Sequence, residues 1–304
     1  MRRAQLLSWV ACLILLCGCV SDSRREAPQR DRAARQLLFE HLVADAMRLY
    51  AEGVAGPPAM ATGYFHQARD RIADALDIQP VEARRATLRL WLGWISFRCL
   101  GEPEEAIRQY REALAQDPDA KRPRLELAAV YGHLSLRALR SGDVARSERF
   151  LESARGMYRE MFERWPRDGA IRSDLGVLYL DHGLAQEAHG ILKEAVDLDP
   201  DRAEAWANLG TACAILALGA EEEAAYRRAI RVSRTGVADA FFGLGRLYAE
   251  RAEVSAAAYY LRGFLRRTAR GRTDQVVLYA VRYLVEAGRG GEVPRMLMGD
   301  DERQ

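Results

Sequence analysis

The chain has 304 residues, with 45 basic and 43 acidic side chains. Arg2 and Arg3 are the only charged residues before Cys19, so a product beginning at Cys19 would carry 43 of each sign. This balance gives no argument for binding nucleic acid or an anionic membrane surface, and the length allows one or two domains with a full core.

Residues 1–18 have the layout of a secretory signal peptide. Arg2 and Arg3 precede an apolar run from Leu6 to Leu16, and small residues follow. The run is too short to span a bilayer as a stable helix, which needs roughly 20 apolar residues. We therefore expect this segment to direct export rather than to remain as a membrane span.

The end of this segment, Leu16-Cys17-Gly18-Cys19, resembles the lipobox of bacterial lipoproteins. The resemblance implies that Cys19 is acylated on sulfur and that the signal is cut just before it. Several acyl chains on one cysteine hold a protein far more firmly than a single chain does. The alternatives are an ordinary secretory signal that is cut elsewhere and an uncleaved anchor.

Residues 19–32 are predicted to be a flexible tether. The segment is polar and charged, contains Pro28, and shows no apolar periodicity. A dozen residues of extended chain reach at most about 40 Å, so the rest of the protein would lie close to its membrane.

Residues 33–298 are predicted to form an all-α solenoid. Leu-Gly pairs recur at Gly176, Gly210 and Gly245, which are 34 and 35 residues apart. This spacing resembles the tetratricopeptide repeat, whose period is 34 residues and whose pattern is W-x2-L-G-x2-Y, then A-x3-F, then P. The resemblance implies six helix pairs and a C-terminal capping pair over 274–288 and 293–298, followed by a tail at 299–304.

One unit carries nearly the full signature, and two others depart from it. The full unit contains Leu175, Gly176, Tyr179, Gly183, Ala188, Leu192, Ala195 and Pro200. A weaker unit has Trp94 where glycine is expected. Another has 19 residues from Ser147 to Pro166 where Ala188 to Pro200 spans 12. The surplus of seven residues predicts a longer second helix over 143–165, either as a local packing device or as a docking feature.

No catalytic, cofactor or metal site is predicted, and the chain is predicted not to be an enzyme. It contains no G-x-S-x-G, no H-E-x-x-H and no phosphate-binding glycine loop. His182 and His189 have no cysteine or carboxylate at zinc-ligand spacing. Cys213 replaces the tyrosine of the repeat pattern and is predicted to be a small buried residue. Glu221 begins a predicted second helix, where its charge complements the helix dipole.

The resemblance also implies a concave surface, lined by the first helix of each pair, that holds segments of partner proteins. It places on this surface Trp91, Ile95, Ser173, Val177, Asn208, Thr211, Phe242 and Arg246. Asn208 corresponds to a family position that often holds the partner backbone. Asp239 and Gly243 stand where some members carry paired basic residues that clamp a terminal carboxylate, so no such clamp is expected. The alternative is that Trp91 and Phe242 pack within the superhelix.

These features predict a lipid-anchored interaction scaffold in the cell envelope, facing the periplasm. Val20 after the modified cysteine indicates delivery to the outer membrane. The expected partners are protein or peptide segments in the groove and the membrane through lipid on Cys19, with no nucleic acid and no small-molecule substrate. The arrangement resembles the pilotin-like lipoproteins that assist secretin assembly for type IV pili. An adaptor or subunit of a peptidoglycan or protease enzyme complex, or a purely structural spacer, is the alternative.

Overall fold

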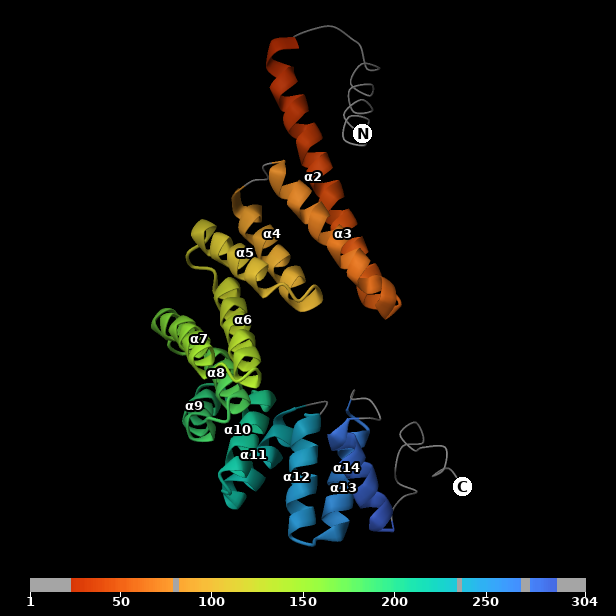
Figure 1. The fold of residues 1–304 in the computed structure, drawn as a ribbon, viewed down its shortest axis with the longest axis vertical. Helices are drawn as coiled ribbons and strands as arrows, with labels where there is room; N and C mark the ends of the chain where they lie inside the picture. The colour runs from red at the N-terminus through yellow and green to blue at the C-terminus, as the bar shows by residue number, and fades with distance from the viewer. Residues whose placement is uncertain (1–22, 79–81, 234–236, 269–273, 289–304) are drawn as a thin grey trace. The chain divides into compact units, whose positions relative to one another are not determined.

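A computed structural model describes residues 23–78, 82–233, 237–268 and 274–288 (Figure 1). The predicted signal peptide, Cys19, the second capping helix at 293–298 and the tail lie outside these residues. Within them the regular structure consists of thirteen α-helices and one short π-helix, so the all-α prediction is confirmed. No helix in this part of the chain combines the length and the apolar character needed to cross a bilayer.

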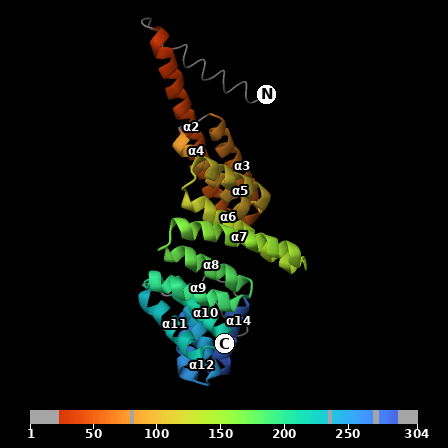
Figure 2. The ribbon, with the colours of Figure 1, turned by 90° about the vertical axis from the view of Figure 1, so that its left-hand side faces the viewer.

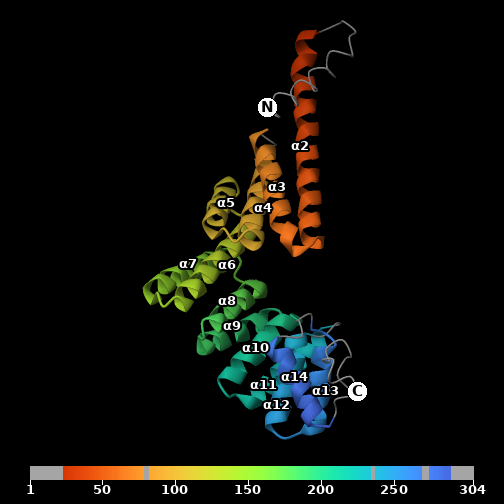
Figure 3. The same ribbon diagram turned by 45° about the vertical axis from the view of Figure 1, so that its right-hand side comes forward.

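The chain divides into two compact units, Met1–Pro123 and Arg124–Gln304. The first contains α2 (Ser23–Ala55), α3 (Pro58–Asp77), α4 (Glu82–Trp94), the π-helix η1 (Ile95–Cys99) and α5 (Pro103–Gln116). Within this unit α2 packs against α3, and α4 packs against α5 (Figure 3). Phe39, Ile72 and Leu92 are among the side chains that fill the core shared by these helices.

The prediction of a flexible tether through residue 32 is wrong for residues 23–32, which form the first turns of α2. A helix that is polar on all sides shows no apolar periodicity, and its residues here are mainly Arg, Glu, Ala and Gln, which have high helix propensity. A helix rises 1.5 Å per residue, so these ten residues span about 15 Å and not the length of an extended chain.

The second unit contains most of the repeats. α6 (Lys121–Arg140), whose first residues belong to the first unit, is followed by α7 (Val144–Arg164), α8 (Gly169–Asp181), α9 (Ala185–Leu198), α10 (Ala203–Ile215), α11 (Gly219–Val232), α12 (Ala238–Glu250), α13 (Val254–Leu265) and α14 (Gln275–Glu286). Figure 2 shows α8, α9 and α10 following one another as neighbours. α8 pairs with α9, α10 with α11, and α12 with α13.

The motif glycine of each first helix lets the second helix approach closely. A Cβ added to Gly176 would lie 2.5 Å from Cγ and Cδ2 of Leu192, and one added to Gly210 would lie 2.6 Å from the ring of Tyr226. Seven residues after the motif glycine, the turn between the helices needs a left-handed backbone. Gly183 supplies it with φ of 71°, and Ala217 adopts φ of 57° at the same place. Such a left-handed turn occurs in the five pairs from α4–α5 to α12–α13, including the two in which alanine takes the place of glycine.

The first unit shows how one pair accommodates an extra residue. Gly93, not Trp94, occupies the place of the motif glycine, because a Cβ there would lie 2.5 Å from the ring of Tyr110. Eight residues separate Gly93 from the left-handed Gly101, instead of seven. The π-helix absorbs the additional residue through its wider turn, closed by the hydrogen bond from the Leu100 amide to the Ile95 carbonyl at 3.1 Å.

The longer second helix predicted over 143–165 is confirmed as α7, which has 21 residues where α9 has 14. The structure adds that α6 is also long, with 20 residues where α8 has 13. Met161, in the extra length of α7, is fully buried, and Arg124 of α6 lies 3.7 Å from Glu160 and over the Trp165 ring. The extra length therefore packs one long helix against the other, which supports a local packing device.

The first capping helix, predicted over 274–288, is observed as α14. Val277, Ala280 and Leu284 are buried in one core with Phe241 and Phe264 from α12 and α13. Figure 1 shows α14 beside these helices at the C-terminal end of the second unit. The helix therefore covers the apolar face of the last full pair, as a terminal repeat must.

Candidate functional site

Six of the eight predicted groove residues are at least partly accessible, and two are not. Ile95 and Ser173 are buried, with 1% and 3% of their surfaces exposed, so the prediction that they face a partner is wrong. For Ile95 the cause is the one-residue shift at the π-helix. Relative to Gly93, Trp94 takes the place expected for Ile95, and the Trp94 side chain is partly exposed.

The residue that follows the motif glycine position is accessible in each of the five motif-bearing pairs. Val177 is 38% exposed, and the other members of this series are partly exposed. The series consists of Trp94, Leu136, Val177, Thr211 and Arg246. The preceding position is packed against the second helix, whereas this residue is accessible on each first helix.

Asn208 and Thr211 lie on α10 and differ in how their polar groups are used. The Thr211 hydroxyl lies 3.2 Å from the Ala207 carbonyl and 3.3 Å from the Tyr226 hydroxyl. The half-buried Asn208 side chain has no hydrogen bond within the described part of the chain. Its amide can both donate and accept, as a peptide group requires. Asn208 is therefore free to bind the backbone of a partner segment.

Trp91 and Phe242 contribute to packing, the alternative left open by the sequence. The Phe242 ring lies 5.3 Å from Phe264 and 5.8 Å from Tyr279 between centroids, within the core shared with α14. Trp91 packs on the first unit's core, 6.5 Å from the Tyr50 ring. Both rings are partly buried, so shortening either one would disturb the fold as well as any surface.

Arg246 is held by two carboxylates. Its guanidinium donates to buried Glu222 at 2.7 Å and pairs with Glu250. Burial raises the pKa of the Glu222 carboxyl, and the charge of Arg246 opposes that effect. Gly243, at the position where a carboxylate clamp would need a basic residue, packs against the Tyr226 ring and leaves no room for a side chain. A clamp at this pair is therefore excluded by packing.

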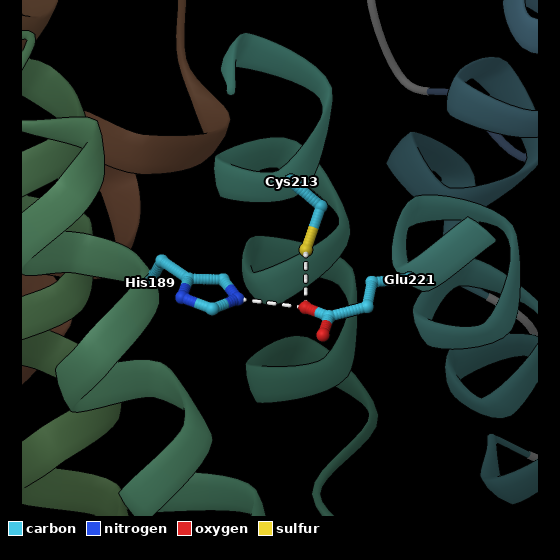
Figure 4. A group of neighbouring side chains, drawn as sticks. All are labelled: His189, Cys213 and Glu221. Atoms are coloured by element: carbon cyan, nitrogen blue, oxygen red, sulfur yellow. Dashed lines mark hydrogen bonds and ion pairs between the residues drawn. The ribbon is translucent and has the colours of Figure 1, made fainter. Parts of the chain in front are cut away.

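His189, Cys213 and Glu221 come together on three consecutive helices, α9, α10 and α11 (Figure 4). His189 Nε2 lies 2.8 Å from Glu221 Oε2, and Cys213 Sγ lies 3.8 Å from the same oxygen. No cysteine or carboxylate lies at zinc-ligand spacing from His189 along the chain, but the structure brings these three residues together because the helices stack. Cys213 is fully buried, as predicted.

The surroundings of the Cys213 thiol disfavour its ionisation. Burial, reinforced by the Glu221 carboxylate, raises the pKa of Cys213 to about 11. The hydrogen bond with His189 lowers the pKa of Glu221. The free thiol therefore stays protonated and unreactive at neutral pH. At neutral pH a Cys213 thiolate would form only if a bound cation took the place of the thiol proton.

Comparison with known families identifies tetratricopeptide repeats in the chain. Two family models, each described as a tetratricopeptide repeat, match residues 138–213 and 88–120. Repeats of this class stack into surfaces that bind other proteins, and the chain is a repeat scaffold of this kind. No curated protein matches the sequence.

Many solved structures share the fold at low sequence identity. Pseudomonas aeruginosa PilF is 18% identical with a TM-score of 0.55, and the match covers 69% of this chain and 88% of PilF. PilW, described as a widely conserved type IV pilus biogenesis factor, is 18% identical with a TM-score of 0.51, covering 68% of this chain and 89% of PilW. Yeast Tom70 is 14% identical with a TM-score of 0.57, covering 88% of this chain and 61% of Tom70. Identities this low support the fold alone.

Proposed function

We propose that this tetratricopeptide repeat protein is a lipid-anchored docking scaffold that faces the periplasm and assists assembly of an envelope complex such as a type IV pilus secretin. The observation that carries the docking role is the series of accessible side chains that follow the motif glycine position within the second unit, from Leu136 to Arg246. On each of these helices the preceding motif position is packed against the second helix, so the series offers a defined set of contacts.

The chemistry of the series suits a peptide segment. Val177 offers an apolar contact, and Asn208 offers an unpaired amide on the neighbouring first helix. An extended or helical segment needs both, apolar contacts for affinity and amide hydrogen bonds for its backbone. PilW, one of the proteins with a similar fold, is described as a type IV pilus biogenesis factor, which makes an envelope assembly the first partner to test.

The proposed anchor depends on Cys19. The sequence Leu16-Cys17-Gly18-Cys19 supports lipid attachment there, and α2 would begin only four residues later, at Ser23. Cells given a fatty-acid analogue should label the wild-type protein and not the Cys19→Ala variant, which should leave the membrane fraction. Label and membrane association that persist in this variant would reject the anchor.

The docking role is tested by crosslinking from defined positions. A photoreactive residue at Val177, exposed on α8, should capture the partner in cells, whereas one at Gln186, exposed on α9, serves as the matched control. Capture of a secretin subunit from position 177 only, with loss of secretin multimers when the protein is deleted, is the expected result.

Other outcomes would redirect the proposal. Capture of a peptidoglycan enzyme or a protease from position 177 would replace the secretin role with the adaptor alternative. Equal capture from positions 177 and 186, or none from either, would contradict docking on the first helices.

A further inference from the structure

The geometry points to a binding site for a thiophilic divalent metal of the Zn²⁺ class, formed by His189 Nε2, Cys213 Sγ and Glu221 Oε2. These three atoms all lie within 4.8 Å of one another, and each comes from a different helix (Figure 4). Nitrogen, sulfur and carboxylate oxygen are the three donor types that zinc prefers in proteins. The inference does not depend on which protein the scaffold binds.

The present spacing is close to that of a bound ion. Around tetrahedral zinc, bonds of about 2.0 to 2.3 Å place neighbouring donors about 3.3 to 3.6 Å apart. His189 Nε2 and Glu221 Oε2 are already 2.8 Å apart, and Cys213 Sγ is 3.8 Å from the same oxygen. The widest separation, up to 4.8 Å, must shrink by about an ångström. The Glu221 side chain is 53% exposed and can rotate to allow the ion between the three atoms.

Charge balance favours a divalent ion. With the thiol deprotonated, Cys213 and Glu221 contribute two negative charges and His189 none, so a doubly charged metal would neutralise the group. Lys193 on α9 lies near enough to Cys213 and Glu221 to influence both electrostatically, and it opposes a cation. A metal with strong thiolate affinity is required to overcome both this charge and the proton on sulfur.

The cysteine distinguishes this place from the equivalent ones in neighbouring repeats. The motif position of Cys213 is a tyrosine in the pairs before and after it. Tyr179 lies beneath the Arg155 guanidinium, and Tyr248 bonds to Glu223 at 2.8 Å. Among these three described pairs, Cys213 alone brings a thiol at this position against the preceding second helix. A metal there would tie α9 to the α10–α11 pair and leave its fourth coordination position to water.

Cobalt(II) is the probe, because a thiolate–cobalt bond gives a charge-transfer absorption that imidazole and carboxylate ligands do not give. The protein should be the full chain with Cys12, Cys17 and Cys19 changed to serine, so that Cys99 and Cys213 are its remaining cysteines. We expect one thiolate–cobalt band that saturates at one equivalent and disappears when zinc is added. The band should persist in the matched control Cys99→Ser and vanish in Cys213→Ser.

Two further variants keep the test valid if Cys213→Ser fails to fold. His189→Gln and Glu221→Gln alter side chains that are 16% and 53% exposed, and each should weaken cobalt binding at least about tenfold. Zinc should raise the thermal midpoint of the parent protein and not that of either variant. No thiolate band with excess cobalt, a band that survives in folded Cys213→Ser, or affinity unchanged in both glutamine variants would overturn the assignment.

Discussion

Two glycines in the α8–α9 pair should respond differently to the same substitution. Alanine at Gly176 would place its Cβ 2.5 Å from Cγ and Cδ2 of Leu192, a side chain with no exposed surface. Carbon atoms prefer separations of about 3.5 to 4.0 Å, so Leu192 or the helix must move by roughly 1 Å. Gly190 has no atom within 4 Å of such a Cβ.

The magnitudes follow from two opposing effects. Each substitution gains about 0.5 to 1 kcal/mol because alanine favours a helix more than glycine does. At Gly176 this gain is opposed by overpacking, which costs about 1 to 3 kcal/mol in a filled core. The Gly176→Ala protein should therefore be less stable than the Gly190→Ala protein by about 1 to 3 kcal/mol.

Urea unfolding followed by circular dichroism measures this difference directly. Both substitutions lie in one helix pair, so the coupling of that pair to its neighbours affects the two variants alike. Gly190→Ala should raise the midpoint above wild type, and Gly176→Ala should fall below Gly190→Ala. Equal midpoints for the two variants would show that the motif glycine is not required for close approach of α9, and the packing argument for the repeats would fail.

Three further predictions concern turns, pH and the proposed docking surface. Ala217→Gly should stabilise the protein by about 1 kcal/mol because glycine tolerates the φ of 57°, whereas Ala214→Gly, inside α10, should destabilise it by a similar amount. Hydrogen bonds from Arg48 and then Arg71 lower the pKa of Asp45, so its contribution to stability is present above about pH 4 and is lost as the pH falls through the lowered pKa. Asp45→Asn should therefore reduce stability at neutral pH and flatten the acid limb of the stability curve. Phe242→Ala should lower thermal stability, whereas Asn208→Ala should leave it within about 0.5 kcal/mol and weaken partner capture.

Each of these predictions has a clear contrary result. Equal effects of the two glycine substitutions in thermal unfolding would show that the turn is not strained. An unchanged slope of stability against pH below pH 4 in Asp45→Asn would show that the α2–α3 ion pairs are too exposed to matter. A large loss of stability in Asn208→Ala would show that its amide is structural.

The repeat period could be predicted from sequence because it depends on local features of each helix pair. Leu175-Gly176 and its equivalents lie on one helical face, and the turn seven residues later is left-handed whether it holds Gly183 or Ala217. Counting back seven residues from Gly101 gives Trp94, whereas the packed glycine is Gly93, so this pair has one extra residue. The extra residue explains why the prediction for Ile95 is wrong, since a shift of one residue along a helix turns a side chain by about 100°.

The His189–Cys213–Glu221 cluster has no ligand spacing along the chain, because its three residues meet only across the stack of helices. In three consecutive pairs the motif tyrosine position meets the preceding second helix at an offset of 24 or 25 residues. Cys213 follows His189 by 24 residues, Tyr179 follows its partner Arg155 by 24, and Tyr248 follows its partner Glu223 by 25. In a repeat protein, side chains that share this offset are neighbours, so a search for ligand sets should use the repeat period as well as the helical one.

The two insertions in the α6–α7 pair are one structural feature. Residue Ser135, at the motif glycine position, is the fifteenth residue of α6, whereas Gly176 is the eighth of α8, so the extra seven residues precede it. In α7 the extra seven follow Ser147, whose carbonyl accepts a hydrogen bond of 2.8 Å from the Ser135 hydroxyl. Because paired helices are antiparallel, both additions lie at the same end of the pair. Seven residues make nearly two full helical turns, which returns each apolar face to its partner.

Removing seven residues from α6 alone would leave the buried Tyr158 and Met161 of α7 without a neighbour, and removing seven from α7 alone would leave the facing side of α6 without one. Removing both would restore a pair of ordinary length.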